Sequence, residues 1–262
     1  MTTVESRPVG ALLREWRERR RLSQLQLSLD ADISARHLSF VETGRSKPTK
    51  EMILRLSEQL DVPLRERNGL LLAGGYAPAY PAGSLDAPEL AAVLAALRQV
   101  LAGHEPNPAL VVDRHWQLID GNDSAGLFLE GAAPDLLEPP VNVLRLSLHP
   151  AGLAPSIVNL GEWRAHVLSR LHRQATATAD PVLRDLHAEL RDYPCDQPVP
   201  EVELPGAGDV VVPLRFRHGG AELSFFSTTT VFGTPLDVTV AELAIESFFP
   251  ADRSTMDHLR NR

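Results

Sequence analysis

Apolar positions between residues 10 and 73 recur at helical spacing in five successive stretches. Residues of the types preferred at helix N-caps precede three of them: Ser23, Ser34 and Thr49. Gly44 follows the third stretch, where glycine can take the left-handed backbone that ends a helix. The pattern predicts a compact all-α bundle of five short helices.

The helical pattern stops near residue 75. Residues 75–87 are rich in proline, glycine and alanine and show no period, which is typical of a linker. An apolar helix is expected next, over 88–102, either as a connector or as a dimer contact. We therefore divide the chain into a first domain over 1–75, a linker with a connecting helix over 76–104, and a second domain over 105–262.

The second domain mixes strand and helix patterns. A two-residue turn at Gly219-Gly220 is typical of a hairpin. Two strands, then helices, then three strands predict an α+β domain with an antiparallel sheet and flanking helices. Strands are expected over 109–113, 116–121, 210–218, 221–232 and 238–247, and helices over 122–129, 142–148, 162–178 and 181–192.

Charge is divided unevenly along a chain whose net charge is −8. Residues 1–75 hold 13 basic and 10 acidic side chains, whereas the remainder holds 13 basic and 24 acidic ones. This asymmetry suggests that one end of the chain meets a polyanion. A solvated protein surface would produce the same imbalance.

Several classes of chemistry are excluded by composition. Lys47 and Lys50 are the only lysines, so no phosphate-loop lysine, Schiff-base lysine or Ser–Lys pair can follow residue 50. The single cysteine, Cys195, excludes a disulfide framework, and no two of the nine histidines are four residues apart. We expect no catalytic residues, no metal site and no required cofactor.

Hydropathy indicates neither a signal peptide nor a membrane partner. No run of 18 apolar residues occurs in the sequence. We expect a soluble, cytoplasmic protein.

Residues 22–44 have the spacing of a helix-turn-helix, in which the start of the second helix enters the major groove of DNA. Arginine can read guanine, and Phe or Ala can contact a thymine methyl group. The basic loop that follows would meet phosphates. An ordinary helical bundle is the alternative. The candidate DNA-binding residues are Ser34, Ala35, Arg36, His37, Ser39 and Phe40 on the second helix, and Arg45, Lys47 and Lys50 in the loop.

This segment resembles the Xre family of Cro/repressor-like DNA-binding domains. The resemblance rests on the motifs Leu22-Ser23-Gln24, Ser34 and Glu42-Thr43-Gly44 with Pro48. It implies that Gln24 touches a phosphate, that Ala35, Arg36, His37 and Phe40 face bases, and that Arg17 pairs with Glu42. One departure is Asp32, at a left-handed turn position where the family usually has glycine.

The second half resembles the ligand-binding domain of the MmyB-like transcription regulators. The matching stretches are PALVVDRHW (108–116), PPVNVLRLSLHPAGLAP (139–155) and NLGEWRAHVLSRL (159–171). The resemblance implies a PAS-like fold that holds an apolar, fatty-acid-like ligand.

A ligand carboxylate in that domain would need an arginine, a histidine or neutral donors, because the domain has no lysine. Arg145 leads the candidates, followed by His149 and Arg164; the alternative is that the arginines are solvated and His149 stabilises a turn. Trp116, Trp163 and Phe225 either line the ligand pocket or belong to the core.

These observations predict that the protein is a sequence-specific transcriptional regulator. It is expected to bind a double-stranded DNA operator as a homodimer and to sense a small apolar ligand. The main alternative is a constitutive DNA-binding regulator whose second domain only dimerises. An enzyme with a DNA-targeting module is disfavoured by the missing catalytic motifs.

Overall fold

The computed structural model describes residues 7–85, 87–198 and 212–261. The chain forms two compact units, one comprising residues 1–84 with 234–241 and the other residues 85–233 with 242–262. The expected linker region over 76–104 is divided between them, and the helix within it belongs to the second unit. Each unit is described by itself.

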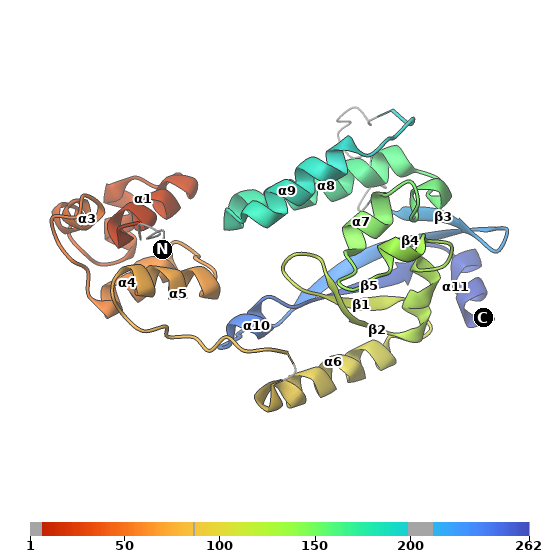
Figure 1. Ribbon diagram of the computed structural model, residues 1–262, viewed down its shortest axis with the longest axis horizontal. Coiled ribbons are helices and arrows are strands. Elements are labelled where there is room, and N and C mark those ends of the chain that lie inside the picture. The colour runs from red at the N-terminus through yellow and green to blue at the C-terminus, as the bar shows by residue number, and fades with distance from the viewer. Residues whose placement is uncertain (1–6, 86, 199–211, 262) are drawn as a thin grey trace. The chain divides into compact units, whose positions relative to one another are not determined.

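The first unit contains the five predicted helices, and this part of the fold prediction is confirmed. Ser23, Ser34 and Thr49 cap three of them, because each hydroxyl accepts a hydrogen bond from the amide three residues later. A common core includes Leu13, Leu38 and other buried apolar side chains. The helices are α1 (Val9–Arg19), α2 (Gln24–Asp30), α3 (Ala35–Glu42), α4 (Lys50–Gln59) and α5 (Leu64–Ala73) (Figure 1).

Helix α1 crosses α3 at very close range. A Cβ atom placed on Gly10 would lie 2.0 Å from the carbonyl oxygen of Val41, so this position has room only for glycine. The turn before α3 is tight as well, since Asp32 has a left-handed φ of 50°. Backbone packing therefore fixes how α3 sits in the bundle.

Residues 76–84 are attached to the bundle through Asn68. Its side-chain amide donates to the carbonyl of Tyr80, and its oxygen accepts from the amides of Ala79 and Tyr80. A segment from far along the chain joins them, because the amide of Val238 donates to the carbonyl of Pro81 at 2.8 Å.

That segment corrects one prediction. The sequence predicts one strand over residues 238–247, but Val238–Ala241 forms the short helix α10, and the strand β5 runs over Ala244–Pro250. The cause is Asp237, whose carboxylate accepts hydrogen bonds from the amides of Thr239 and Val240 and so starts a helical turn.

The second unit is built on a five-stranded antiparallel sheet in the order β2-β1-β5-β4-β3, which confirms the predicted α+β class. Gly219 and Gly220 both have positive φ and form the predicted hairpin turn. Of the strand expected over 210–218, residues 210 and 211 lie outside the described residues. The strands are β1 (Ala109–Val112), β2 (Leu118–Gly121), β3 (Leu214–His218), β4 (Ala221–Val231) and β5.

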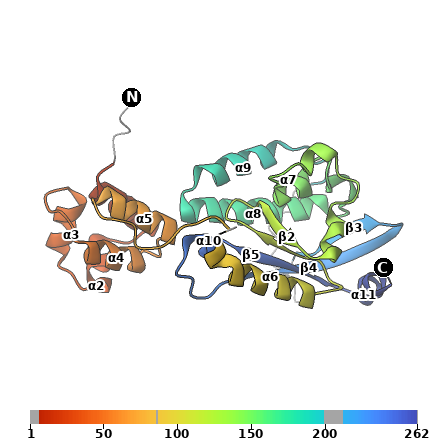
Figure 2. The same cartoon turned by 60° about the horizontal axis from the view of Figure 1, so that its bottom comes forward.

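Helices cover both faces of this sheet (Figures 1 and 2). Ala109 and Val111 of β1 pack on α6, whereas Leu110 and Val112 belong to a larger core on the opposite face. This interior strand of the sheet is therefore buried on both sides. The main helices are α6 (Ala91–Gly103), α7 (Val143–Leu148), α8 (Leu160–Thr178), α9 (Pro181–Asp192) and α11 (Arg253–Arg260), and the short 3-10 helix η2 spans Asp123–Phe128.

Candidate functional site

Helix α3 presents a polar face away from the core. Leu38 and Val41 are buried, whereas Arg36 is exposed and His37 and Phe40 are partly exposed. Two guanidinium groups flank the ring of Phe40: that of Arg36 at 5.4 Å and that of Arg45 at 6.0 Å from its centroid. This face therefore carries an aromatic ring with a cation–π contact to each of two arginines.

The loop after α3 continues the basic surface. Gly44 has a left-handed φ of 72°, and the amides of Arg45 and Ser46 both donate hydrogen bonds to the carbonyl of Phe40. Arg45 and Lys47 are exposed and Lys50 is partly exposed. The predicted base-facing side chains of α3 and the predicted phosphate-facing side chains of the loop are thus all exposed or partly exposed.

A buried ion pair holds α3 to α1. Arg17 Nε and one terminal nitrogen donate to the two carboxylate oxygens of Glu42 at 2.7 and 2.8 Å, and the Glu42 side chain is only 1% exposed. These hydrogen bonds raise the pKa of Arg17. Gln24 donates to the same carboxylate at 2.8 Å, so the side chain that resemblance assigns to a phosphate contacts Glu42 here.

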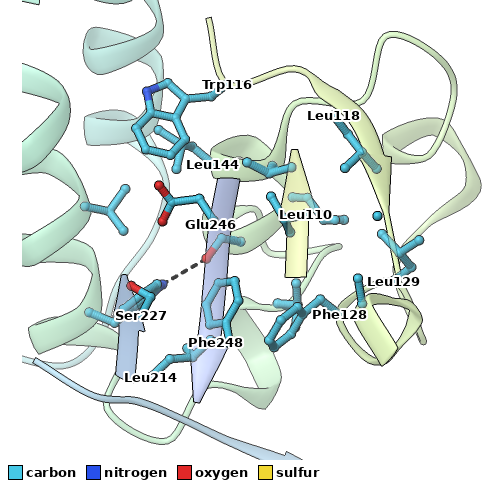
Figure 3. A pocket seen from close by; sticks show the side chains of 18 of the residues that line it. Leu110, Trp116, Leu118, Phe128, Leu129, Leu144, Leu214, Ser227, Glu246 and Phe248 are labelled. Carbon is cyan, nitrogen blue, oxygen red and sulfur yellow. Dashed lines mark hydrogen bonds between the residues drawn. The ribbon is translucent and has the colours of Figure 1, made fainter. Parts of the chain in front are cut away.

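A cavity of about 360 Å³ lies in the second unit, between the sheet and α7, α8 and η2 (Figure 3). Volumes of about 300–1,000 Å³ are typical of small-molecule sites. The apolar part of its lining consists of Leu110, Trp116, Leu118, Gly121, Ala125, Gly126, Phe128, Leu129, Val143, Leu144, Leu146, Leu153, Ile157, Trp163, Val167, Leu214 and Phe248. The polar part consists of Asn122, Asp123, Ser147, His166, Arg170, Ser227 and Glu246.

Two tryptophans form part of the wall and are fixed by hydrogen bonds. Trp116 Nε1 donates to Gln174 at 2.8 Å, and Trp163 Nε1 donates to Ser147 at 2.9 Å. Trp116 has a left-handed φ of 67°, a conformation that costs energy for a bulky residue. These two side chains of the apolar wall are therefore each held in one orientation by a hydrogen bond.

An ion pair lies in this apolar wall. The guanidinium of Arg170 donates to both carboxylate oxygens of Glu246, at 2.5 and 3.1 Å, and also to Thr229. The same guanidinium stands 4.5 Å from the ring centroid of Trp116. The Glu246 side chain is 5% exposed, and Figure 3 shows it among the side chains that line the cavity.

His166 is the histidine of the lining. Its ring stacks on Trp163 at 5.6 Å. Burial lowers the pKa of His166, and the neighbouring charges of Arg170 and Arg173 lower it further. The imidazole is consequently neutral near pH 7.

Two of the six residues predicted from the sequence to hold the ligand line this cavity: Trp116 and Trp163. Phe225 is fully buried in the aromatic core beside Phe128 and Phe216. The three predicted carboxylate partners, Arg145, His149 and Arg164, are not part of the lining.

The predicted carboxylate partners have other contacts. Arg145 forms a two-point ion pair with Glu189, which in turn accepts a hydrogen bond from Tyr193. The hydrogen bonds from Arg145 lower the pKa of Glu189. Burial raises the pKa of Tyr193 to about 12, and the hydrogen bond to Glu189 is the second cause of that rise. His149 accepts from the amide of Ala151, and Arg164 donates to the carbonyls of Arg191 and Tyr193.

Sequence reasoning missed Arg170, Glu246 and His166, although local signals existed. Glu246 interrupts an otherwise apolar strand, AIESFFP. His166 and Arg170 share the helix face of Trp163 and Val167, so two polar residues lie on a stripe that points to the core. A charged residue on a face that is otherwise buried is the kind of signal that marks a candidate functional residue.

No helix among the described residues is long and apolar enough to cross a membrane. Within the described ranges, no three side chains of His, Cys, Asp or Glu gather closely enough to hold a metal ion.

Comparison with known proteins assigns both halves of the chain. The family model described as MmyB-like transcription regulator ligand binding domain matches residues 93–261, and the model described as Helix-turn-helix matches residues 13–67. No curated protein matches the chain.

One solved structure shows a weak likeness to the chain. It is described as an RNA-binding Light-Oxygen-Voltage receptor, with 13% identity and a TM-score of 0.28. The similarity covers 100% of this chain and 63% of that one, so the chain spans less than two thirds of that protein. A TM-score this low carries no argument about the fold.

Proposed function

The chain belongs to the family of MmyB-like transcription regulators, and from this premise we propose that its second unit senses a small apolar, fatty-acid-like molecule and thereby controls operator binding. The observation that carries the ligand proposal is the apolar cavity of about 360 Å³. Each buried methylene of a hydrocarbon chain contributes about 0.8 kcal/mol. A chain of a dozen carbons would therefore be held mainly by burial.

The chain itself connects the proposed ligand cavity to the helix-turn-helix unit. The β4–β5 connection carries α10, which belongs to the helix-turn-helix unit, and the flanking strands carry Ser227 and Glu246 in the cavity wall. Thr239 of α10 donates to the carbonyl of Gly83 at 2.8 Å, in the segment that Asn68 fastens to α5. A ligand that shifts β4 or β5 would act on this attachment.

The experiment for the ligand is mass spectrometry of the full chain, purified from cells, under native and denaturing conditions. We expect a bound molecule that is lost on denaturation, and stabilisation of the protein when C12–C18 amphiphiles are added. An unliganded protein that no such amphiphile stabilises would favour the alternative, a constitutive regulator whose second unit only dimerises.

DNA binding divides the candidate residues into two classes. After selection of the operator from random DNA, Arg36→Ala should weaken operator binding by about 1–3 kcal/mol and relax the preference at one base pair. Lys47→Ala should weaken binding to operator and random DNA alike. It should also reduce, by about one unit, the slope of the logarithm of the binding constant against the logarithm of salt concentration. Titrations of both variants on both DNAs test this, and equal losses for Arg36→Ala would place that residue on a phosphate.

We further propose that the regulator acts as a homodimer. Helix-turn-helix domains usually read two half-sites about 34 Å apart through a two-fold axis. One such domain buries little DNA surface, so tight and specific binding favours two copies.

A further inference from the structure

The loop after α3 is held by a residue that follows the five-helix bundle. Pro48 stands in this loop between Lys47 and Lys50 and is buried. Its carbonyl accepts a hydrogen bond from the hydroxyl of Tyr76 at 3.0 Å, although the two residues are 28 positions apart. This hydrogen bond therefore restrains the backbone between the two lysines that are predicted to face phosphates.

Tyr76 is itself fixed against the bundle. Its amide donates to the carbonyl of Leu71 at 2.8 Å, and its partly buried ring packs against the core of the first unit. Gly75, directly before it, has a left-handed φ of 83° and turns the chain there. A Cβ atom built on Gly75 would lie 3.6 Å from Nζ of Lys47, so the ammonium group of this lysine lies beside the turn. The loop after α3 and the turn after α5 are thus in contact.

Residues 76–84, the strap, extend this contact to α10. Their sequence is typical of a linker, but Asn68 of α5 holds the middle of the strap by three hydrogen bonds. Helix α10 donates to two carbonyls of the strap, at 2.8 Å each, through the amide of Val238 and the hydroxyl of Thr239. All of these residues belong to the first unit. One end of the strap therefore contacts the phosphate-facing loop, and the other end contacts α10.

We propose that Tyr76 is a positioning residue for DNA binding: its hydroxyl holds the loop after α3 where Lys47 and Lys50 meet phosphates, and the strap makes this position depend on α10. A loop that is ordered before DNA arrives loses less conformational freedom on binding. The first part rests on DNA binding by the helix-turn-helix unit, and the dependence on α10 rests on the proposed sensing function. The alternative is that Tyr76 only stabilises the bundle.

Tyr76→Phe in the full chain tests the first part, because it removes the hydroxyl and keeps the ring. Without ligand, we expect operator and random DNA to bind about three- to tenfold more weakly, the factor that corresponds to one ordinary hydrogen bond. The slope of the logarithm of the binding constant against the logarithm of salt concentration should become shallower by up to about one unit. Titrations on both DNAs over a range of salt concentrations measure both quantities.

Tyr80→Phe is the matched control. It removes the hydroxyl of the other tyrosine of the strap, which accepts from Arg67 at 3.4 Å, and should leave DNA affinity and the salt dependence unchanged. A Tyr76→Phe protein that melts at a lower temperature but keeps the wild-type affinity and salt dependence would show that Tyr76 only stabilises the bundle, and would overturn the proposal.

The dependence on α10 is tested with dodecanoic acid as the probe. Thr239→Val removes the hydroxyl that donates to the strap and preserves the shape of the side chain. We expect Thr239→Val and Tyr76→Phe to lose most of the change in operator affinity that the probe causes in the wild-type protein. The thermal shift that the probe produces should stay the same. A full response in both variants would contradict the dependence on α10.

The ligand-free and probe experiments separate the two parts of the proposal. Dodecanoic acid that leaves the operator affinity of the wild-type protein unchanged would count against the proposed sensing function, and the dependence on α10 would fail with it. The role of Tyr76 in positioning the loop is decided by the ligand-free titrations, whatever the probe does.

Discussion

Replacing Glu42 with alanine is expected to lower the free energy of unfolding of the helix-turn-helix bundle by about 3–5 kcal/mol. Glu42 is almost fully buried and accepts from Arg17 and Gln24. Its removal leaves the Arg17 guanidinium with one hydrogen-bond acceptor, the carbonyl of Leu22, and with the exposed carboxylate of Glu18 3.8 Å away. A buried charge that has lost its hydrogen-bonded carboxylate is the reason for the large effect.

Amide hydrogen exchange of the full chain measures this loss of stability at individual helices of the bundle. The protected amides of α1 and α3 should exchange roughly two to three and a half orders of magnitude faster, since each tenfold change corresponds to about 1.4 kcal/mol. Glu15→Ala is the matched control: it breaks a partly exposed ion pair with Arg19 on the same helix, and its effect should be much smaller.

The paired replacement Arg17→Met with Glu42→Leu should recover most of the loss, because apolar side chains of similar volume can replace a buried ion pair. Unchanged exchange in Glu42→Ala would show that the pair does not hold the recognition helix. A paired variant that is as unstable as the single one would place the cost in side-chain packing instead.

The helix-turn-helix could be predicted because its signals are local. Ser23 and Ser34 cap helices that start one residue later, and Gly44 ends α3 with a positive φ. The Gly219-Gly220 hairpin is equally local, since two adjacent positive φ angles suit glycine. Such features depend on a few neighbouring residues and need no knowledge of the tertiary fold.

The features that are hardest to predict from the sequence depend on contacts with residues far away along the chain. Residues 238–241 have the β-branched composition of a strand, but the capping carboxylate of Asp237 and attachment to Pro81 make them helical. The contact between Arg17 and Glu42 came from family resemblance, because nothing local joins residues 25 positions apart.

The candidate ligand site was only half predictable for the same reason. Residue type alone marks Trp116 and Trp163 as candidates, since large aromatic residues line apolar cavities, and both do so here. Residue type also marks Arg145 as a candidate cation, but its charge is paired with Glu189 on α9. Which arginine faces the cavity depends on helix orientation and on the position of each acidic partner, and neither follows from spacing alone.

The second large effect is expected at Gly152, in the turn that follows α7. A Cβ atom on Gly152 would lie 2.2 Å from the carbonyl oxygen of Leu146 and 3.1 Å from its carbon. Gly152 does not have a left-handed φ, so the added methyl group itself, and not backbone strain, is the obstacle. To admit it, the turn must move and the hydrogen bond from the amide of Leu153 to Leu146 must break.

Gly152→Ala should therefore destabilise the second unit at or beyond the upper end of the range for overpacked sites, about 1–3 kcal/mol. In a chain of this size, roughly 3 kcal/mol lowers the melting temperature by about 6–12 °C. Gly103→Ala, at the end of α6, is the matched control: its added methyl group meets no atom within 4 Å, and melting should change little.

Gly152→Ala should also weaken ligand binding, because Leu146 and Leu153 both line the cavity and the shifted turn moves them. The measurement is thermal unfolding of both variants with and without a C12 amphiphile. Wild type and Gly103→Ala should gain the same stabilisation from the ligand, and Gly152→Ala should gain less. A Gly152→Ala protein that melts and responds like wild type would show that the turn yields freely, and that the packing of α7 against it does not define the cavity.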